Sequence, residues 1–112
     1  MIEKIVLDYL TEKMQPVAVS MEVPENSALP FVVVEKTGSG RTNKIGSATF
    51  AIQSYAGSLL LAAELNEAVK SAMDDMAELA EVCSTRLNSD YNFTDTASKR
   101  YRYQAVYDIT HY

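Results

Sequence analysis

The spacing of apolar residues changes along the 112-residue chain, and the order of these changes constrains the fold more than any motif does. Residues 2–14 and 58–79 repeat apolar side chains at three- and four-residue spacing, as one face of an α-helix does. Alternating or β-branched runs, typical of strands, fill five other segments: 17–23, 31–36, 47–55, 82–93 and 100–110. The order predicts an α+β fold, α-β-β-β-α-β-β, with two helices on one face of a single sheet of about five strands.

The size and composition of the chain fit one domain over residues 1–112. Hydrophobic residues make up 47% of the sequence and charged residues 22%, which are ordinary proportions for a folded domain with its own core. No repeat or low-complexity linker divides the chain, and residues 24–30 form a polar connection between two predicted strands. On the long helix, the predicted buried stripe consists of Leu61, Leu65, Ala68, Val69, Ala72, Met73 and Met76.

The formal net charge of −5 means that phosphate backbones and anionic membrane surfaces repel the molecule as a whole. The apolar runs are far shorter than a membrane span, and the first residues do not form an export signal. Cys83 is the only cysteine, which leaves no internal disulfide and fits synthesis in a reducing cytosol. We therefore expect no nucleic-acid specificity and no membrane partner.

Residues 37–46 hold three of the four glycines together with small polar and basic residues, so the sequence predicts a long flexible loop between two strands. The run Gly38-Ser39-Gly40 superficially resembles a phosphate-binding loop. Such a loop joins a strand to a helix, however, and here both neighbours are predicted strands. A basic loop that contacts a protein partner is the favoured interpretation.

Few residues are candidates for catalysis or metal binding. His111, the only histidine, has no upstream partner of the kind that acyl transfer or a metal site requires, and is interpreted as a terminal strand residue. Cys83 is interpreted as a semi-buried structural thiol, although folding could bring it close to His111. Around the end of the long helix, an acidic surface is favoured over a metal site at Asp74, Asp75, Glu78 and Glu81. No catalytic, cofactor-binding or metal-ligating residue is predicted.

The last predicted strand alternates aromatic and basic side chains. Tyr101, Tyr103 and Tyr107 are expected on one face, with Arg100 and Arg102 on the other. Such a strand could stack nucleobases, but the acidic total favours a place in the core or in a protein interface.

The closing stretch Tyr101-Arg102-Tyr103-Gln104-Ala105-Val106-Tyr107, the glycine-rich segment between the second and third strands, and the order of elements together resemble one known family. This family is the tail-terminator, or tail-completion and head–tail joining, proteins of long-tailed bacteriophages and prophages. Residues 48–55 and 63–66 also resemble small proteins from the tail-gene region of prophages in Gram-positive bacteria. The resemblance covers essentially the whole chain.

The resemblance implies a hexameric ring that caps the tail tube and helps to join tail to head by protein–protein binding, without enzymatic activity. The implied partners are other copies of the chain, the tail-tube protein and the head connector protein. The implied location is the host bacterial cytoplasm during assembly and then the virion tail. By position, the partner-contact loop would consist of Gly38, Gly40, Arg41, Asn43 and Lys44.

Two other classes of function stay open. A small enzyme or ligand-binding domain would need a pocket between sheet and helix, with Tyr55, Tyr103 or Cys83 as its polar groups. A head-completion protein from the same phage region is not distinguished from a tail terminator by this sequence.

Overall fold

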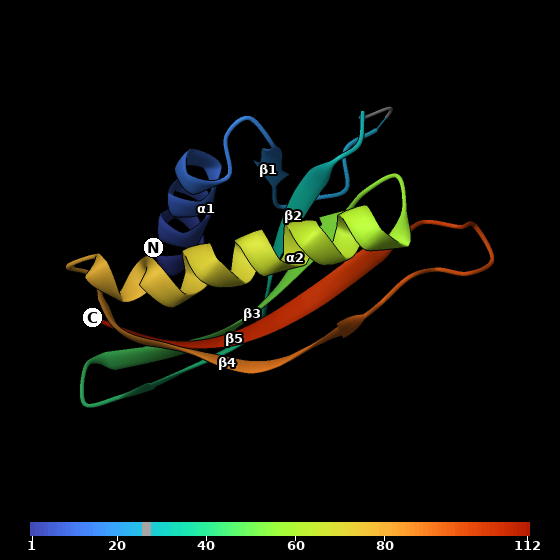
Figure 1. Ribbon diagram of the computed structural model, residues 1–112. Coiled ribbons are helices and arrows are strands. Elements are labelled where there is room, and N and C mark those ends of the chain that lie inside the picture. The colour runs from blue at the N-terminus through green and yellow to red at the C-terminus, as the bar shows by residue number, and fades with distance from the viewer. Residues whose placement is uncertain (26–27) are drawn as a thin grey trace.

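The computed structural model describes residues 1–25 and 28–112, and its elements follow the predicted order (Figure 1). The α+β prediction is confirmed, with two helices and one five-stranded mixed sheet. The elements are α1 Ile2–Lys13, β1 Ala18–Ser20, β2 Phe31–Thr42, β3 Ile45–Tyr55, α2 Leu59–Asp74, a 3-10 turn Asp75–Glu78, β4 Val82–Asn92 and β5 Arg102–His111.

The strand order in the sheet is β1-β2-β3-β5-β4, which the sequence did not predict. β1 runs parallel to β2, and the three other pairs are antiparallel. Both helices cover the same face of the sheet, and α2 lies lengthwise over β3 and β5 (Figure 1). The β2–β3 hairpin and the β4–β5 connection therefore extend toward opposite ends of a molecule whose longest dimension is 44 Å.

The core lies between the two helices and the sheet. α1 contributes Val6 and Leu10 to it, and the most buried sheet residues include Phe50 and Tyr107. Because these side chains recur at helical spacing in the helix and at alternate positions in the strands, one continuous apolar cluster forms. Tyr107 also donates its hydroxyl hydrogen to Asp74 at 2.8 Å, which fixes the end of α2 to β5.

The buried stripe of α2 differs from the predicted one at two positions. Leu61 is 53% exposed and Ala68 is exposed, whereas Ala62 and Asn66 are buried. The Ser58 hydroxyl accepts a hydrogen bond from the Leu61 amide and caps the helix, whose buried face carries Ala62 and Asn66 but not Leu61 and Ala68. The helix is also shorter than predicted, because a 3-10 turn replaces it after Asp74.

The prediction of a flexible loop over residues 37–46 is wrong. β2 continues to Thr42 and β3 begins at Ile45, with a β-bulge between Lys36 and Gly38. Asn43 and Lys44 have φ angles of 51° and 68°, as a two-residue turn that matches the strand twist requires. Backbone hydrogen bonds between strands do not depend on side-chain type, so a segment rich in glycine and serine can extend a hairpin that turn residues have started.

β1 is shorter than the predicted strand over 17–23, because its parallel partner begins only at Phe31 and pairs with three residues. Met21 and Val23 follow it and are exposed. The predicted polar connection over 24–30 includes residues 26–27, which lie outside the described residues.

Candidate functional site

The predicted partner-contact residues lie on the β2–β3 hairpin, which projects beyond the helices (Figure 1). A groove of about 520 Å³ runs along this hairpin, from the start of α1 and the end of β5 to the turn. Gly40, Arg41 and Lys44 line the groove, whereas Gly38 at the bulge and Asn43 in the turn do not. The structure thus brings three of the five predicted residues together at one surface.

The groove owes part of its shape to Gly46. A Cβ atom at this position would lie 2.5 Å from Cε1 of His111, so any other residue there would displace the His111 ring. Glycine therefore lets the His111 ring pack across β3 from the end of β5, where it lines the groove. The sequence placed His111 correctly on a terminal strand, but it held no signal for this contact because the two residues are far apart in the chain.

Most of the charged side chains in the groove are basic. Lys36 forms an ion pair with Glu3 at 2.9 Å, and the hydrogen bond from Lys36 holds the pKa of the Glu3 carboxyl below its usual range. Arg41 and Lys44 form no ion pair with another residue in the described part of the chain. A protein with a net charge of −5 thus presents an uncompensated basic hairpin, which favours an acidic partner surface.

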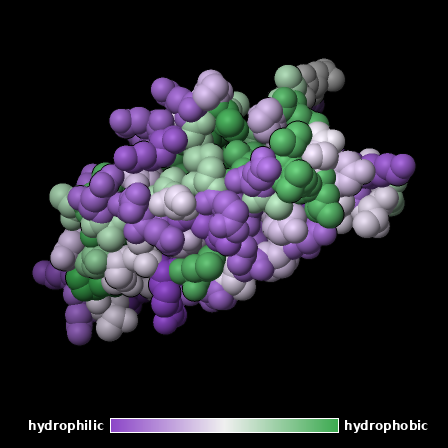
Figure 2. Space-filling model, viewed as in Figure 1, coloured by the Kyte–Doolittle hydropathy of each residue, from purple (hydrophilic) through white to green (hydrophobic). Residues whose placement is uncertain are grey.

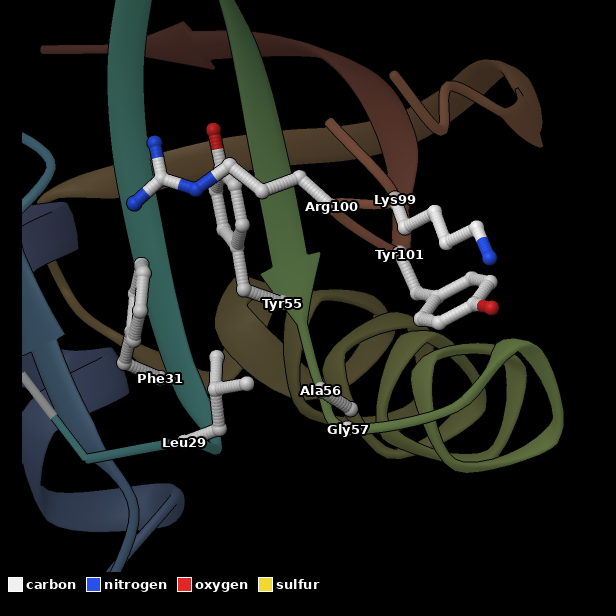
Figure 3. A pocket seen from close by; sticks show the side chains of 8 residues that line it. All are labelled: Leu29, Phe31, Tyr55, Ala56, Gly57, Lys99, Arg100 and Tyr101. Atoms are coloured by element: carbon white, nitrogen blue, oxygen red, sulfur yellow. The ribbon is translucent and has the colours of Figure 1, made fainter. Parts of the chain in front are cut away.

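A second hollow lies at the opposite end of the molecule (Figure 3). It has a volume of about 200 Å³ and an aromatic wall, in which the Phe31 and Tyr55 rings stack with their centroids 4.6 Å apart. The Arg100 guanidinium lies across the Tyr55 ring, 5.7 Å from its centroid, and Lys99 and Tyr101 form the other side. We call this hollow the aromatic–basic pocket.

Arg102 supports the wall of the aromatic–basic pocket from the open face of the sheet. It donates from Nη1 to the Tyr55 hydroxyl at 2.8 Å and from Nε to the Phe93 carbonyl at 2.7 Å. Gln53 and Gln104 continue the hydrogen-bonded network across β3 and β5. Tyr55 is consequently held in one position, and its ring is only 1% exposed.

The polar groups of the alternative enzyme site do not converge. Tyr55 faces the open side of the sheet, and Tyr103 lies one residue from Arg102 on β5 and faces the helix side. The prediction that Cys83 is semi-buried is wrong, because the residue lies at the first bulge of β4 and is exposed. His111 pairs with Val82 beside Cys83, and the proximity of Cys83 raises the pKa of the Tyr112 hydroxyl. Over residues 1–25 and 28–112, no group of three His, Cys, Asp or Glu side chains could hold a metal ion.

The fold and its two hollows define an α+β sandwich with a projecting basic hairpin at one end and an aromatic–basic pocket at the other. No protein-family model matches the chain, and no curated protein matches it. Among the described helices, none is long and apolar enough to cross a membrane.

Proposed function

We propose that this protein is a phage or prophage assembly protein that caps the tail tube as a ring and helps to join the tail to the head. The observation that carries the proposal is the basic β2–β3 hairpin, which projects from the folded core and ends in Arg41 and Lys44 without acidic partners among the described residues. A rigid two-stranded arm of this kind can reach a neighbouring protein without unfolding.

The edges of the sheet also support a ring. A ring requires heterologous contacts, in which one patch of each copy meets a different patch of the next. The sheet offers two different edges: no described strand pairs with the outer side of β4, and none pairs with β2 beyond Val33. Unpaired strand edges are ready to accept backbone hydrogen bonds from another chain.

The test replaces Arg41 and Lys44 together with glutamate and supplies the variant to phage assembly that lacks the native protein. We expect the variant to fold, because both side chains are exposed, and to give uncapped or overlong tails and few infectious particles. Electron microscopy of tails and plaque counts give the readout. The matched control reverses two exposed charges outside the hairpin, Lys4 on α1 and Arg86 on β4, which changes the net charge equally and should leave capping intact. Normal infectious particles from the hairpin variant would overturn the proposal.

A further inference from the structure

The residues of the aromatic–basic pocket leave its positive charge available to a ligand. The side chains of Lys99 and Arg100 form no ion pair or hydrogen bond with another described residue. Arg100 instead lies over the ring of Tyr55, which holds the planar guanidinium with its N–H donors unused (Figure 3). A volume of about 200 Å³ suffices for a small group such as one carboxylate with its methylenes.

Exposed apolar residues surround this pocket. Leu29 is 50% exposed and Leu61 is 53% exposed, and both line a hollow of about 500 Å³ at the start of α2, which shares Leu29, Ala56 and Gly57 with the pocket. Figure 2 shows hydrophobic residues gathered on the right of the molecule, where α2 begins in Figure 1. Apolar surface around free cationic groups is typical of a protein–protein contact.

The backbone of α2 adds to the charge at both of its ends. The helix begins next to the pocket with no acidic residue in its first turn, so the positive end of its dipole is uncompensated there. It ends without a basic residue and leads into Asp75 and Glu78, so acidic side chains add to the negative end. The two ends of α2 therefore differ in charge, and the acidic residues after its last turn lie at the same end of the molecule as the basic β2–β3 hairpin.

The residues at the other end of α2 carry the complementary charge. A hollow of about 240 Å³ between α1 and the segment after α2 has an apolar floor that includes Ile5 and Leu79, with Glu12 and Glu81 at its rim. Burial raises the pKa of the neighbouring Tyr9 hydroxyl to about 12, and the charges of Glu78 and Asp75 contribute to this rise. Lys13 pairs with Glu78 at 3.4 Å and Lys4 with Asp8, but Asp75, Glu12 and Glu81 have no basic partner in the described chain.

We propose that the aromatic–basic pocket binds carboxylates and that its occupant is the acidic segment after α2 in a second copy of this chain, in a head-to-tail contact. Charge complementarity between the two ends of α2 selects this occupant. The contact is heterologous, as a ring requires, and in this respect the inference rests on the proposed function and adds the residues that join neighbouring copies.

The first test is a reciprocal charge reversal. One variant carries Lys99→Glu and Arg100→Glu, and the other carries Asp75→Lys and Glu81→Lys; all four side chains are exposed. In each variant alone, the pocket of one copy and the residues after α2 of the next copy carry charges of the same sign. Sedimentation at low salt should therefore show self-association at least about tenfold weaker than that of the native protein. Mixing the two variants restores opposite charges at both contacts and should restore association.

A second measurement detects the contact even when free copies associate weakly. Carbodiimide joins a lysine amine to a carboxylate that touches it, and an equal mixture of ¹⁴N- and ¹⁵N-labelled protein distinguishes contacts between copies from contacts within one. We expect mixed-isotope cross-links from Lys99 to Asp75, Glu78 or Glu81. The variant with Lys99→Glu alone, which keeps Arg100 on Tyr55, should lose these cross-links and keep the native melting temperature.

The outcomes separate this inference from the proposed function. Native self-association of the pocket variant, failure of the mixture to associate, or absence of the mixed-isotope cross-links would each overturn the head-to-tail contact. The variant with Arg41→Glu and Lys44→Glu is the control, because it has the same charge change and should keep the cross-links. If a pocket variant caps tails normally, the proposed function stands. If the native protein forms the cross-links but caps no tails, only the proposed function is overturned.

Discussion

Asp108 shows how one carboxylate links three strands on the open face of the sheet. It accepts hydrogen bonds from Thr49 on β3 at 2.8 Å and from Asn88 on β4 at 3.0 Å, and Arg86 lies 3.6 Å away. The hydrogen bond from Asn88, followed by that from Thr49, lowers the pKa of the Asp108 carboxyl. Its ionised form is therefore favoured by folding.

We expect Asp108→Asn to lower the free energy of unfolding at pH 7 by about 1–2 kcal/mol, since hydrogen bonds to a charged acceptor are lost. Because the pKa of Asp108 is lower in the folded than in the unfolded chain, its carboxylate stabilises the fold at pH values above the unfolded pKa of about 4. This contribution disappears as the pH falls through the folded pKa, so variant and native protein should converge in acid. Urea unfolding at several pH values measures the difference; a gap that does not depend on pH would contradict the assignment.

At the residue scale, the sequence predicted the alternation along β5 but not the contacts across strands. Tyr107 and Ile109 are buried in the core as the pattern of alternate residues required. The bond from Arg102 to Tyr55 joins residues 47 positions apart and depends on β5 lying next to β3. No local pattern encodes which strands are neighbours, so the aromatic–basic pocket could not be predicted from the sequence.

Among the elements, the helices and β3 were predicted more accurately than the β2–β3 connection. Apolar periodicity over many residues defines a helix or a buried strand, because burial is what stabilises them. The outer half of the hairpin buries almost nothing, as its exposed residues from Thr37 to Lys44 show, and so has no apolar pattern to read. Its structure depends instead on the turn at Asn43 and Lys44.

This turn gives a direct test of the hairpin. Lys44 has a φ of 68°, a conformation that glycine adopts without strain, so Lys44→Gly should raise the free energy of unfolding by about 1 kcal/mol. The control is Ser47→Gly in β3, which should lower it by about 0.5–1 kcal/mol, because glycine weakens an ordinary strand position. Urea unfolding of both variants gives the comparison, and destabilisation by Lys44→Gly would show that the turn is wrongly described.

For the whole molecule, one apolar cluster connects both helices to four strands, so the chain should unfold as a unit. Met73 on α2 is fully buried in this cluster, and we expect Met73→Ala to lower the free energy of unfolding by about 2–5 kcal/mol. Met21→Ala, at a residue 46% exposed, should change it by less than about 0.5 kcal/mol. Circular dichroism and tyrosine fluorescence should report the same transition; two separate transitions would contradict a single core.

The position of β5 between β3 and β4 also determines when the protein can fold during its synthesis. β3 is complete at Tyr55, but the strand that pairs with its second edge begins only at Arg102. Until residues up to His111 have left the ribosome, the second edge of β3 is unpaired and α2 lacks one of the strands on which it packs. A nascent chain therefore exposes an unpaired sheet edge while residues after Tyr55 are synthesised, and a product terminated before Arg102 would be a substrate for chaperones or proteases.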